Sequence, residues 1–195
     1  MNNLKYIKDE MLTHVPVCTH VNPNKVLIIG DSKGILEELA KHKCIGITTN
    51  ISENITDELA KLDDSSYDVV IINTDEMITD RVFWGLIAKV IIEKGIVSSL
   101  SSNMYTSQDS FETEIKTAGE VFKIVMPYRY EDDNNGILNM QNLLLLSNSA
   151  HPTADINLQR ADLTDGFNYY NCDIAIGAFL LSTVIRKRFL GLIKS

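Results

Sequence analysis

The chain has 195 residues, of which 45% are hydrophobic, and it carries a formal net charge of −8. This length and composition predict one ordinary globular domain, and no apolar run is long enough to span a bilayer. The acidic charge argues against broad binding to nucleic acid or to an anionic membrane, which needs a basic face. It is compatible with a cationic substrate.

The first predicted elements form a strand–turn–helix unit. Residues 4–13 have helical spacing, and Pro16 and Pro23 predict an extended entry to the first strand. The apolar, β-branched run at residues 26–29 is typical of a strand buried on both faces, and Gly30 follows where the chain turns into a helix over residues 35–42. Such a unit is the first half of a nucleotide-binding βαβ fold, although any α/β domain can contain this turn because glycine fits it.

Two further strands end in polar residues. The second strand is predicted over residues 44–47, before Thr48, Thr49 and Asn50, and the third over residues 67–72, before residues 73–76. A helix over residues 55–62 joins them. Folds that bind a dinucleotide or an S-adenosyl group usually have an acidic residue at the second strand end to hold the ribose, and here that position carries Thr or Asn. The short connection indicates an abridged sheet.

The rest of the chain is predicted to end the sheet with an antiparallel pair. Helices are expected over residues 81–92, ended by Gly95, and over residues 107–119, with strands over residues 96–100 and 121–126, the latter closed by Pro127. Residues 131–136 read as a hairpin turn and residues 142–147 as the returning strand. The tail is polar from residue 152 and helical over residues 172–194. Residues 1–195 therefore form a single α/β domain.

Cysteine and histidine usage argues against a metal centre. The cysteines, Cys18, Cys44 and Cys172, lie far apart, and no Cys/His cluster has metal-ligand spacing. The four histidines are scattered singly and are expected to be surface or packing residues. Because residues 1–10 do not read as a signal peptide, we expect reduced thiols and a cytoplasmic location.

Four segments, in order along nearly the whole chain, resemble the spermidine synthases, the polyamine aminopropyltransferases. Residues 9–16 (D-E-M-L-T-H-V-P) resemble that family's Y-H-E-M-L-x-H-x-P segment, and residues 25–34 match its first strand and glycine loop. Residues 67–76 match the strand before its D-S-T-D-P loop, and residues 169–181 are similar to its Y-Y-N-x-x-I-H-x-x-A-F-x-L-P tail. The resemblance implies a Rossmann-like, class I methyltransferase-type domain, with a mostly parallel sheet and an antiparallel C-terminal hairpin.

The resemblance also implies an activity in polyamine biosynthesis. Family members transfer an aminopropyl group from decarboxylated S-adenosylmethionine, a co-substrate, to putrescine, and they need no permanently bound cofactor or metal. Such a site must hold cations and accept a proton from an amine, and carboxylates serve both needs. The implied catalytic positions are Asp75 and Asn73, and the implied binding positions are Gly30, Asp31, Lys33, Thr48, Asn50, Glu76, Asp9, Glu10, Tyr169 and Tyr170.

The chain departs from the family pattern where charge matters. Lys33 stands at the position of a loop aspartate, Thr48 at that of the ribose-binding glutamate, and Asn73 at that of the presumed base. Asp75 or Glu76 takes the place of the second loop aspartate, although either could instead cap the next helix. From the resemblance, we expect no counterpart within residues 1–195 of the family's adenine-contacting Asp-Gly pair or of its small N-terminal β-domain.

These departures leave an alternative open, namely a catalytically inactive spermidine-synthase-like binding or interaction protein. A small methyltransferase would need the same missing ribose acid and adenine contacts. Tyr169 and Tyr170 could be core residues rather than a wall of the site. A homodimer is left open as the partner, beside the small-molecule amine.

Overall fold

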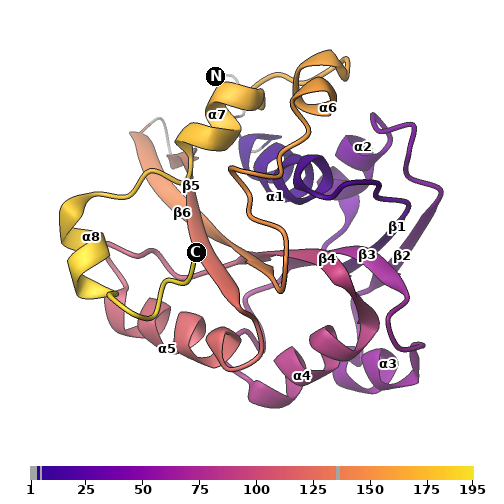
Figure 1. The fold of residues 1–195 in the computed structure, drawn as a ribbon, viewed down its shortest axis with the longest axis horizontal. Helices are drawn as coiled ribbons and strands as arrows, with labels where there is room; N and C mark the ends of the chain where they lie inside the picture. The colour runs from indigo at the N-terminus through magenta and orange to yellow at the C-terminus, as the bar shows by residue number, and fades with distance from the viewer. Residues whose placement is uncertain (1–3, 5, 135–136) are drawn as a thin grey trace.

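The structure, a computed structural model, describes residue 4 and residues 6–134 and 137–195 (Figure 1). Within that part of the chain, six strands form one sheet in the order β2-β1-β3-β4-β6-β5. The strands are β1 Lys25–Gly30, β2 Ile47–Ile51, β3 Tyr67–Asn73, β4 Ile91–Leu100, β5 Ile124–Asn134 and β6 Ile137–Ser147. The helices are α1 Tyr6–Thr19, α2 Lys33–Leu39, α3 Ile55–Lys61, α4 Arg81–Val90, α5 Gln108–Gly119, α6 Leu158–Leu163, α7 Cys172–Gly177 and α8 Thr183–Arg188.

Helices cover both faces of the sheet. Figure 1 shows α1 and α2 on one side and α3, α4 and α5 on the other. Each face has its own apolar cluster: one joins the sheet to α3, α4, α5 and α8, and the other joins it to α1, α2, α6 and α7. Strands β1 to β4 pair in parallel and β6 runs antiparallel to both β4 and β5, which confirms the predicted mostly parallel sheet with a C-terminal hairpin. No helix among the described residues has the length and apolarity needed to cross a membrane.

Three predictions in the first half of the chain are wrong at their boundaries. Pro16 lies inside α1, which is buried from Glu10 to Thr19, so packing against the sheet outweighs the one helical hydrogen bond that proline removes. β2 begins at Ile47, because the backbone N–H groups of Gly46 and Ile47 donate to the Asn24 carbonyl (2.9 and 3.1 Å) and hold the preceding residues in a turn. α4 ends at Val90, and residue 95 lies within β4.

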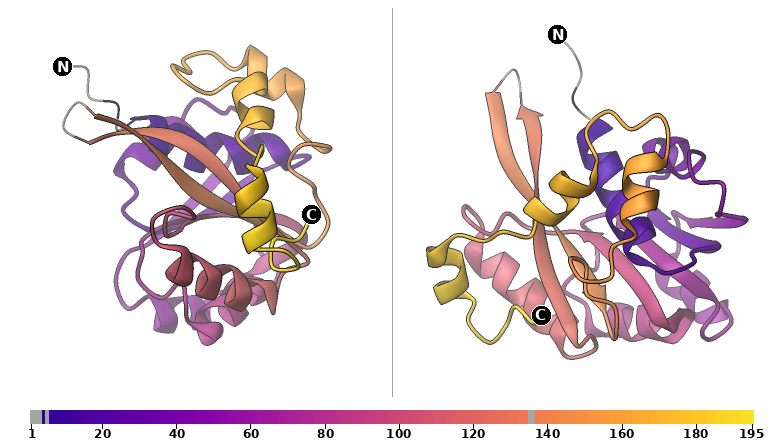
Figure 2. Two further views of the ribbon diagram at one scale, coloured as in Figure 1. Left: turned by 90° about the vertical axis from the view of Figure 1, so that its left-hand side faces the viewer. Right: turned by 45° about the horizontal axis from the view of Figure 1, so that its top comes forward.

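In the second half, the hairpin is longer and the tail less regular than predicted. Pro127 lies within β5, an edge strand. The Val125 N–H, two residues earlier, points outward to the Lys194 carbonyl (2.9 Å), so the ring nitrogen of Pro127 faces the same side and removes no bond to β6. Figure 2 shows the hairpin projecting beyond the body of the molecule, and the predicted turn at residues 131–136 lies partly outside the described residues. The continuous helix expected over residues 172–194 is instead two short helices, α7 and α8.

A chain of buried polar side chains joins α1 to the end of α2. His14 Nε2 lies 2.8 Å from a Glu38 carboxylate oxygen, and His14 Nδ1 lies 2.9 Å from His42 Nε2. With Glu38 ionised, His14 donates from Nε2, so its Nδ1 accepts from His42 and leaves His42 Nδ1 as a buried acceptor without a partner. These two histidines are packing residues, as expected, and the fold brings them together from positions 28 residues apart in the sequence.

The order of the strands reverses between β1 and β3. From β1 the chain passes through α2 to β2 on one side, and then through α3 to β3 on the other side of β1. In open sheets of this kind, ligands bind outside the carboxyl ends of the strands at such a reversal. A ligand site is therefore expected around the residues that follow Gly30 in β1 and Ile72 in β3.

Candidate functional site

The carboxyl ends of β1 and β3 lie in register and are tied together. Gly30 pairs with Asn73, and the Asn73 side-chain amide donates to the Asp31 carbonyl (2.7 Å). Gly30 has φ of +95°, and a Cβ there would lie 2.5 Å from the Asn73 carbonyl oxygen. Glycine is therefore required by both the backbone conformation and the close approach of β3.

The amino-terminal turns of α1 bring two charged residues to this edge. The Lys8 ammonium donates to the Asn73 side-chain oxygen (3.0 Å) and lies 3.6 Å from an Asp9 carboxylate oxygen. Asp9 also packs against Gly34 at the start of α2, where a side chain would collide with the carboxylate. Burial raises the pKa of Asp9, although the Lys8 charge acts in the opposite direction.

Glu10 points away from this edge. Its carboxylate is fully buried and accepts hydrogen bonds from the backbone N–H groups of Asn168, Tyr169 and Tyr170, each at 2.8 Å, and from the Asn168 side chain at 3.2 Å. These four donors fill the acceptor capacity of the carboxylate. Glu10 therefore anchors the segment before α7, and the structure gives it a positioning role.

Asp75 lines a cleft of about 490 Å³ between the end of β3 and the hairpin. The other residues that line it are Ile78, Thr79, Leu100, Ser101, Ser102, Ser110, Glu114, Tyr130, Gln141 and Asn142. Asp75 and Glu76 are both exposed, and neither caps the helix that follows: Asp80 does so, accepting from the Val82 N–H at 2.7 Å. The carboxylate of Asp75 therefore faces the cleft without a helix-capping role.

Two groups in the cleft were not among the predicted site residues. Glu114 is buried, and its carboxylate accepts from the Ser102 N–H at 2.8 Å, while burial raises its pKa. Burial, followed by the charges of Asp132 and Asp9, raises the pKa of Tyr130. Glu114 lies on the apolar face of α5 with Phe111, and a charged residue at such a position is a sequence signal that could have identified it.

The second strand places different residues at the edge than the sequence predicted. Thr48 is the second residue of β2 and pairs with Val26 near the start of β1, so it does not reach the carboxyl edge. Asn50 lies nearer the edge and donates to the Ser32 hydroxyl at 3.0 Å. Glu53 is the first acidic residue after β2 and is exposed, and it was missed because the strand boundary was predicted four residues too early.

Lys33 and the two tail tyrosines have separate environments. Lys33 is exposed in the first turn of α2, where its backbone N–H donates to the Asp31 carboxylate at 3.2 Å. Tyr169 is half-buried in a small pocket of about 160 Å³ between the hairpin and α7, beside Arg129. Tyr170 is buried, with its ring centroid 5.3 Å from that of His14, so it is a core residue.

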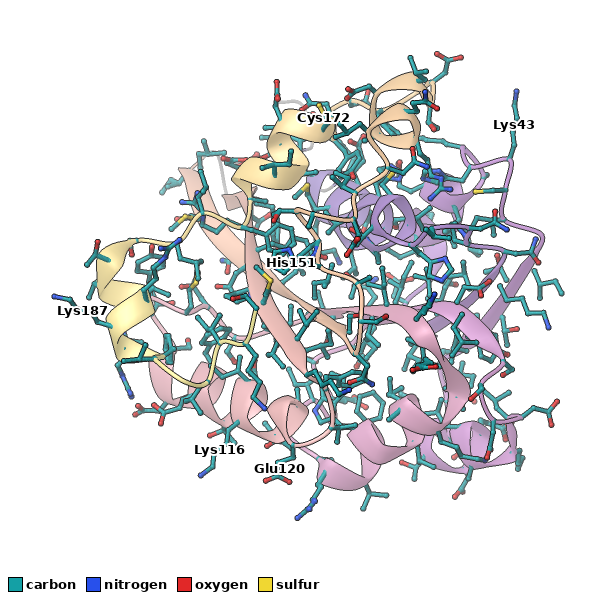
Figure 3. The ribbon with its side chains drawn as sticks, viewed as in Figure 1. Lys43, Lys116, Glu120, His151, Cys172 and Lys187 are labelled. Atoms are coloured by element: carbon teal, nitrogen blue, oxygen red, sulfur yellow. The ribbon has the colours of Figure 1, made fainter. Side chains whose placement is uncertain are left out.

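No group of three or more metal-ligating side chains occurs among the residues that the structure describes. The three cysteines are unpaired, and Cys172 lies on α7 at the upper edge of the view in Figure 3, while Cys18 is buried. The side chains at the edge supply carboxylates, amides, hydroxyls and the Lys8 ammonium.

Comparisons with known proteins identify similar chains. Residues 5–78 match the family model of the spermine/spermidine synthase domain. A polyamine aminopropyltransferase of Bacillus mycoides is 24% identical over 159 residues, a match that covers 64% of this chain and 58% of the relative. The chain thus spans little more than half of that relative's length.

Solved structures share the fold over a greater length. A spermidine synthase in complex with the transition state analogue AdoDATO superposes with a TM-score of 0.85 and 21% identity, over 97% of this chain and 76% of that one. The spermidine synthase from Thermotoga maritima gives a TM-score of 0.84 and 22% identity over the same shares. The predicted fold class is confirmed by these similarities.

Proposed function

We propose that the chain is a divergent member of the spermidine synthase family and that it transfers an aminopropyl group from decarboxylated S-adenosylmethionine to putrescine. The observation that carries the proposal is the position of the cleft. An exposed carboxylate, Asp75, lines a cleft of about 490 Å³ beyond the carboxyl end of β3, one of the two strands at the reversal where this fold class binds ligands. The relatives and the fold support the same assignment.

The reaction places two demands on the site. The nitrogen of a neutral amine attacks the methylene carbon next to the sulfonium, a C–N bond forms, and the C–S bond breaks with its electron pair passing to sulfur. The products are spermidine and neutral methylthioadenosine. Because the attacking amine is protonated near neutral pH, a carboxylate must accept a proton before or during attack.

We assign the proton-accepting role to Asp75. It is the exposed carboxylate of the cleft, whereas the Glu114 carboxylate is buried and already accepts two hydrogen bonds from Ser102. Glu76, Asp31 and Asp9 contribute negative charge that favours a cationic ligand. Asn73 is a carboxamide and serves as a hydrogen-bonding group.

The nucleoside is proposed to lie over the β1 and β2 ends. Gly30 lacks a side chain and would let the ligand approach the backbone, as in other nucleotide-binding turns. Asn50 lies near the end of β2 and Glu53 is the first acidic residue after it, and a carboxylate there can accept from both ribose hydroxyls. Lys33, in the first turn of α2, is proposed as a peripheral contact on this side, and Tyr169, between the hairpin and α7, as a peripheral contact on the hairpin side.

A direct assay tests the proposal. Purified protein is incubated with decarboxylated S-adenosylmethionine and putrescine, and spermidine and methylthioadenosine are measured by mass spectrometry. Loss of a general base typically costs about 10²–10⁴-fold in rate, so Asp75→Asn should reduce turnover on that scale. The matched control is Asp63→Asn, an exposed aspartate near the amino end of β3.

Three results bear on the proposal. Product formation by the wild type and by Asp63→Asn, with strong loss in Asp75→Asn, would support it. Equal rates in the three proteins would refute the role of Asp75. Absence of both products at high protein concentration, with no thermal shift from either substrate, would refute the activity.

A further inference from the structure

We propose that Lys8 weakens diamine binding, because its ammonium occupies the Asn73 side-chain oxygen at the strand reversal, an acceptor that a substrate amine would otherwise use. This inference rests on the proposed function and deepens it. A substrate amine must displace the tethered ammonium, so the side chain of Lys8 lowers the affinity of the site for diamines.

The contacts of Lys8 show that a cation is already held at the strand reversal. Its ammonium lies 3.0 Å from the Asn73 side-chain oxygen and 3.6 Å from Asp9. The Asn73 nitrogen is bound to the Asp31 carbonyl at 2.7 Å, which fixes the amide so that its oxygen faces Lys8. Asn73 is only 8% exposed, so its oxygen has little access to other donors.

The chemistry of the side chain makes it a competitor of the substrate. Lysine presents a primary ammonium on a flexible four-carbon stem, which is the same chemical group as one end of putrescine. Both ammonium groups need the same acceptors, and two like charges in contact at a partly buried site repel. The Lys8 side chain is 32% exposed, so it can leave toward solvent, but only by giving up its bond to Asn73.

The decisive variant is Lys8→Met, which removes the charge and keeps an unbranched stem of similar length. The matched control is Lys43→Met, which removes one positive charge from a residue whose side chain points into solvent away from the body of the protein (Figure 3). Lys8→Gln provides a second neutral variant, and Lys8→Arg keeps the charge. Thermal melts establish that each variant is folded.

Binding is measured by calorimetry in two steps: methylthioadenosine is titrated first, and putrescine is then titrated into the nucleoside-saturated protein. We expect Lys8→Met and Lys8→Gln to lower the putrescine Kd at least tenfold, which is about 1.4 kcal/mol. Lys43→Met and Lys8→Arg should leave it within about twofold of the wild type.

The two-step design separates the two claims. If methylthioadenosine binds every protein but the putrescine Kd is the same in the wild type, Lys8→Met and Lys8→Gln, the role of Lys8 is refuted while the nucleoside site stands. If Lys43→Met tightens binding as much as Lys8→Met, the effect is one of overall charge and the inference is also refuted. If none of the proteins binds methylthioadenosine, the proposed function fails and the role of Lys8 fails with it.

Discussion

Replacement of Glu10 by glutamine tests how the tail is held over the sheet. Each carboxylate oxygen of Glu10 accepts two hydrogen bonds: one takes the backbone and side-chain N–H groups of Asn168, and the other takes the backbone N–H groups of Tyr169 and Tyr170. In Glu10→Gln one oxygen becomes an NH₂ donor that faces two N–H donors in a fully buried position. Two charge-assisted bonds are lost and two buried donors remain unpaired.

Hydrogen bonds to a charged group contribute about 1.5–3 kcal/mol each, so the substitution should lower the free energy of unfolding by about 3–5 kcal/mol. The assay is equilibrium unfolding in urea with the linear extrapolation. Glu37→Gln, the same change at an exposed position on α2, is the matched control and should stay within about 0.5 kcal/mol of the wild type. A loss below about 1 kcal/mol in Glu10→Gln would refute the anchoring role.

Three further predictions concern the strand reversal and the buried histidines. Gly30→Ala should cost about 2–4 kcal/mol in the free energy of unfolding, because φ is +95° and the new Cβ would meet the Asn73 carbonyl; a loss near zero by urea unfolding would contradict this. Desolvation lowers the pKa of His14, and burial and the nearby His14 charge lower that of His42 to about 3. The folded protein keeps both rings neutral while the unfolded chain protonates them below about pH 6.5, so stability is full above that pH and falls below it. His42 alone should contribute a loss of about 2 kcal/mol between pH 7 and pH 5, and His42→Gln should flatten the measured slope of unfolding free energy against pH; an equal slope in both proteins would refute the assignment. Lys33→Asp should lower the putrescine Kd about threefold to tenfold at low salt if the loop faces the ligand, and an unchanged Kd by calorimetry would place Lys33 outside the site.

The buried strands and the sheet type could be predicted from sequence. The apolar runs at residues 26–29 and 69–72 lie in β1 and β3 with both faces covered, because the buried part of such a strand must be apolar. The abridged connection is also confirmed, since within the described part of the chain β2 is the edge strand and pairs only with β1.

Boundaries that depend on tertiary contacts could not be predicted. Nothing in the local pattern indicates that hydrogen bonds to the Asn24 carbonyl delay the start of β2 to Ile47. Because β2 starts later than predicted, Thr48 lies away from its carboxyl end and Glu53 lies close to it. In the sequence, Pro127 predicts the end of a strand. It fits within β5 because β5 lies at the sheet edge, where the N–H groups that point outward make no hydrogen bond to β6.

The grouping of residues at the strand ends could be predicted from sequence, whereas their contacts could not. Gly30, Asp31 and Asn73 do lie together, because parallel strands end at one edge. Lys8 was missed because no local pattern separates a surface lysine on a helix from one whose ammonium reaches a strand end 65 residues away. Glu10 was expected near the ligand because it belongs to a family motif, and its four hydrogen bonds become visible only in three dimensions.

A crystal structure of the protein grown with methylthioadenosine and putrescine tests the central claim most directly. The account predicts the nucleoside over the turn at Gly30, and an amine nitrogen of putrescine within hydrogen-bonding distance of Asp75. Ligand density at any other part of the surface, with the edge between β1 and β3 closed by side chains, would contradict it.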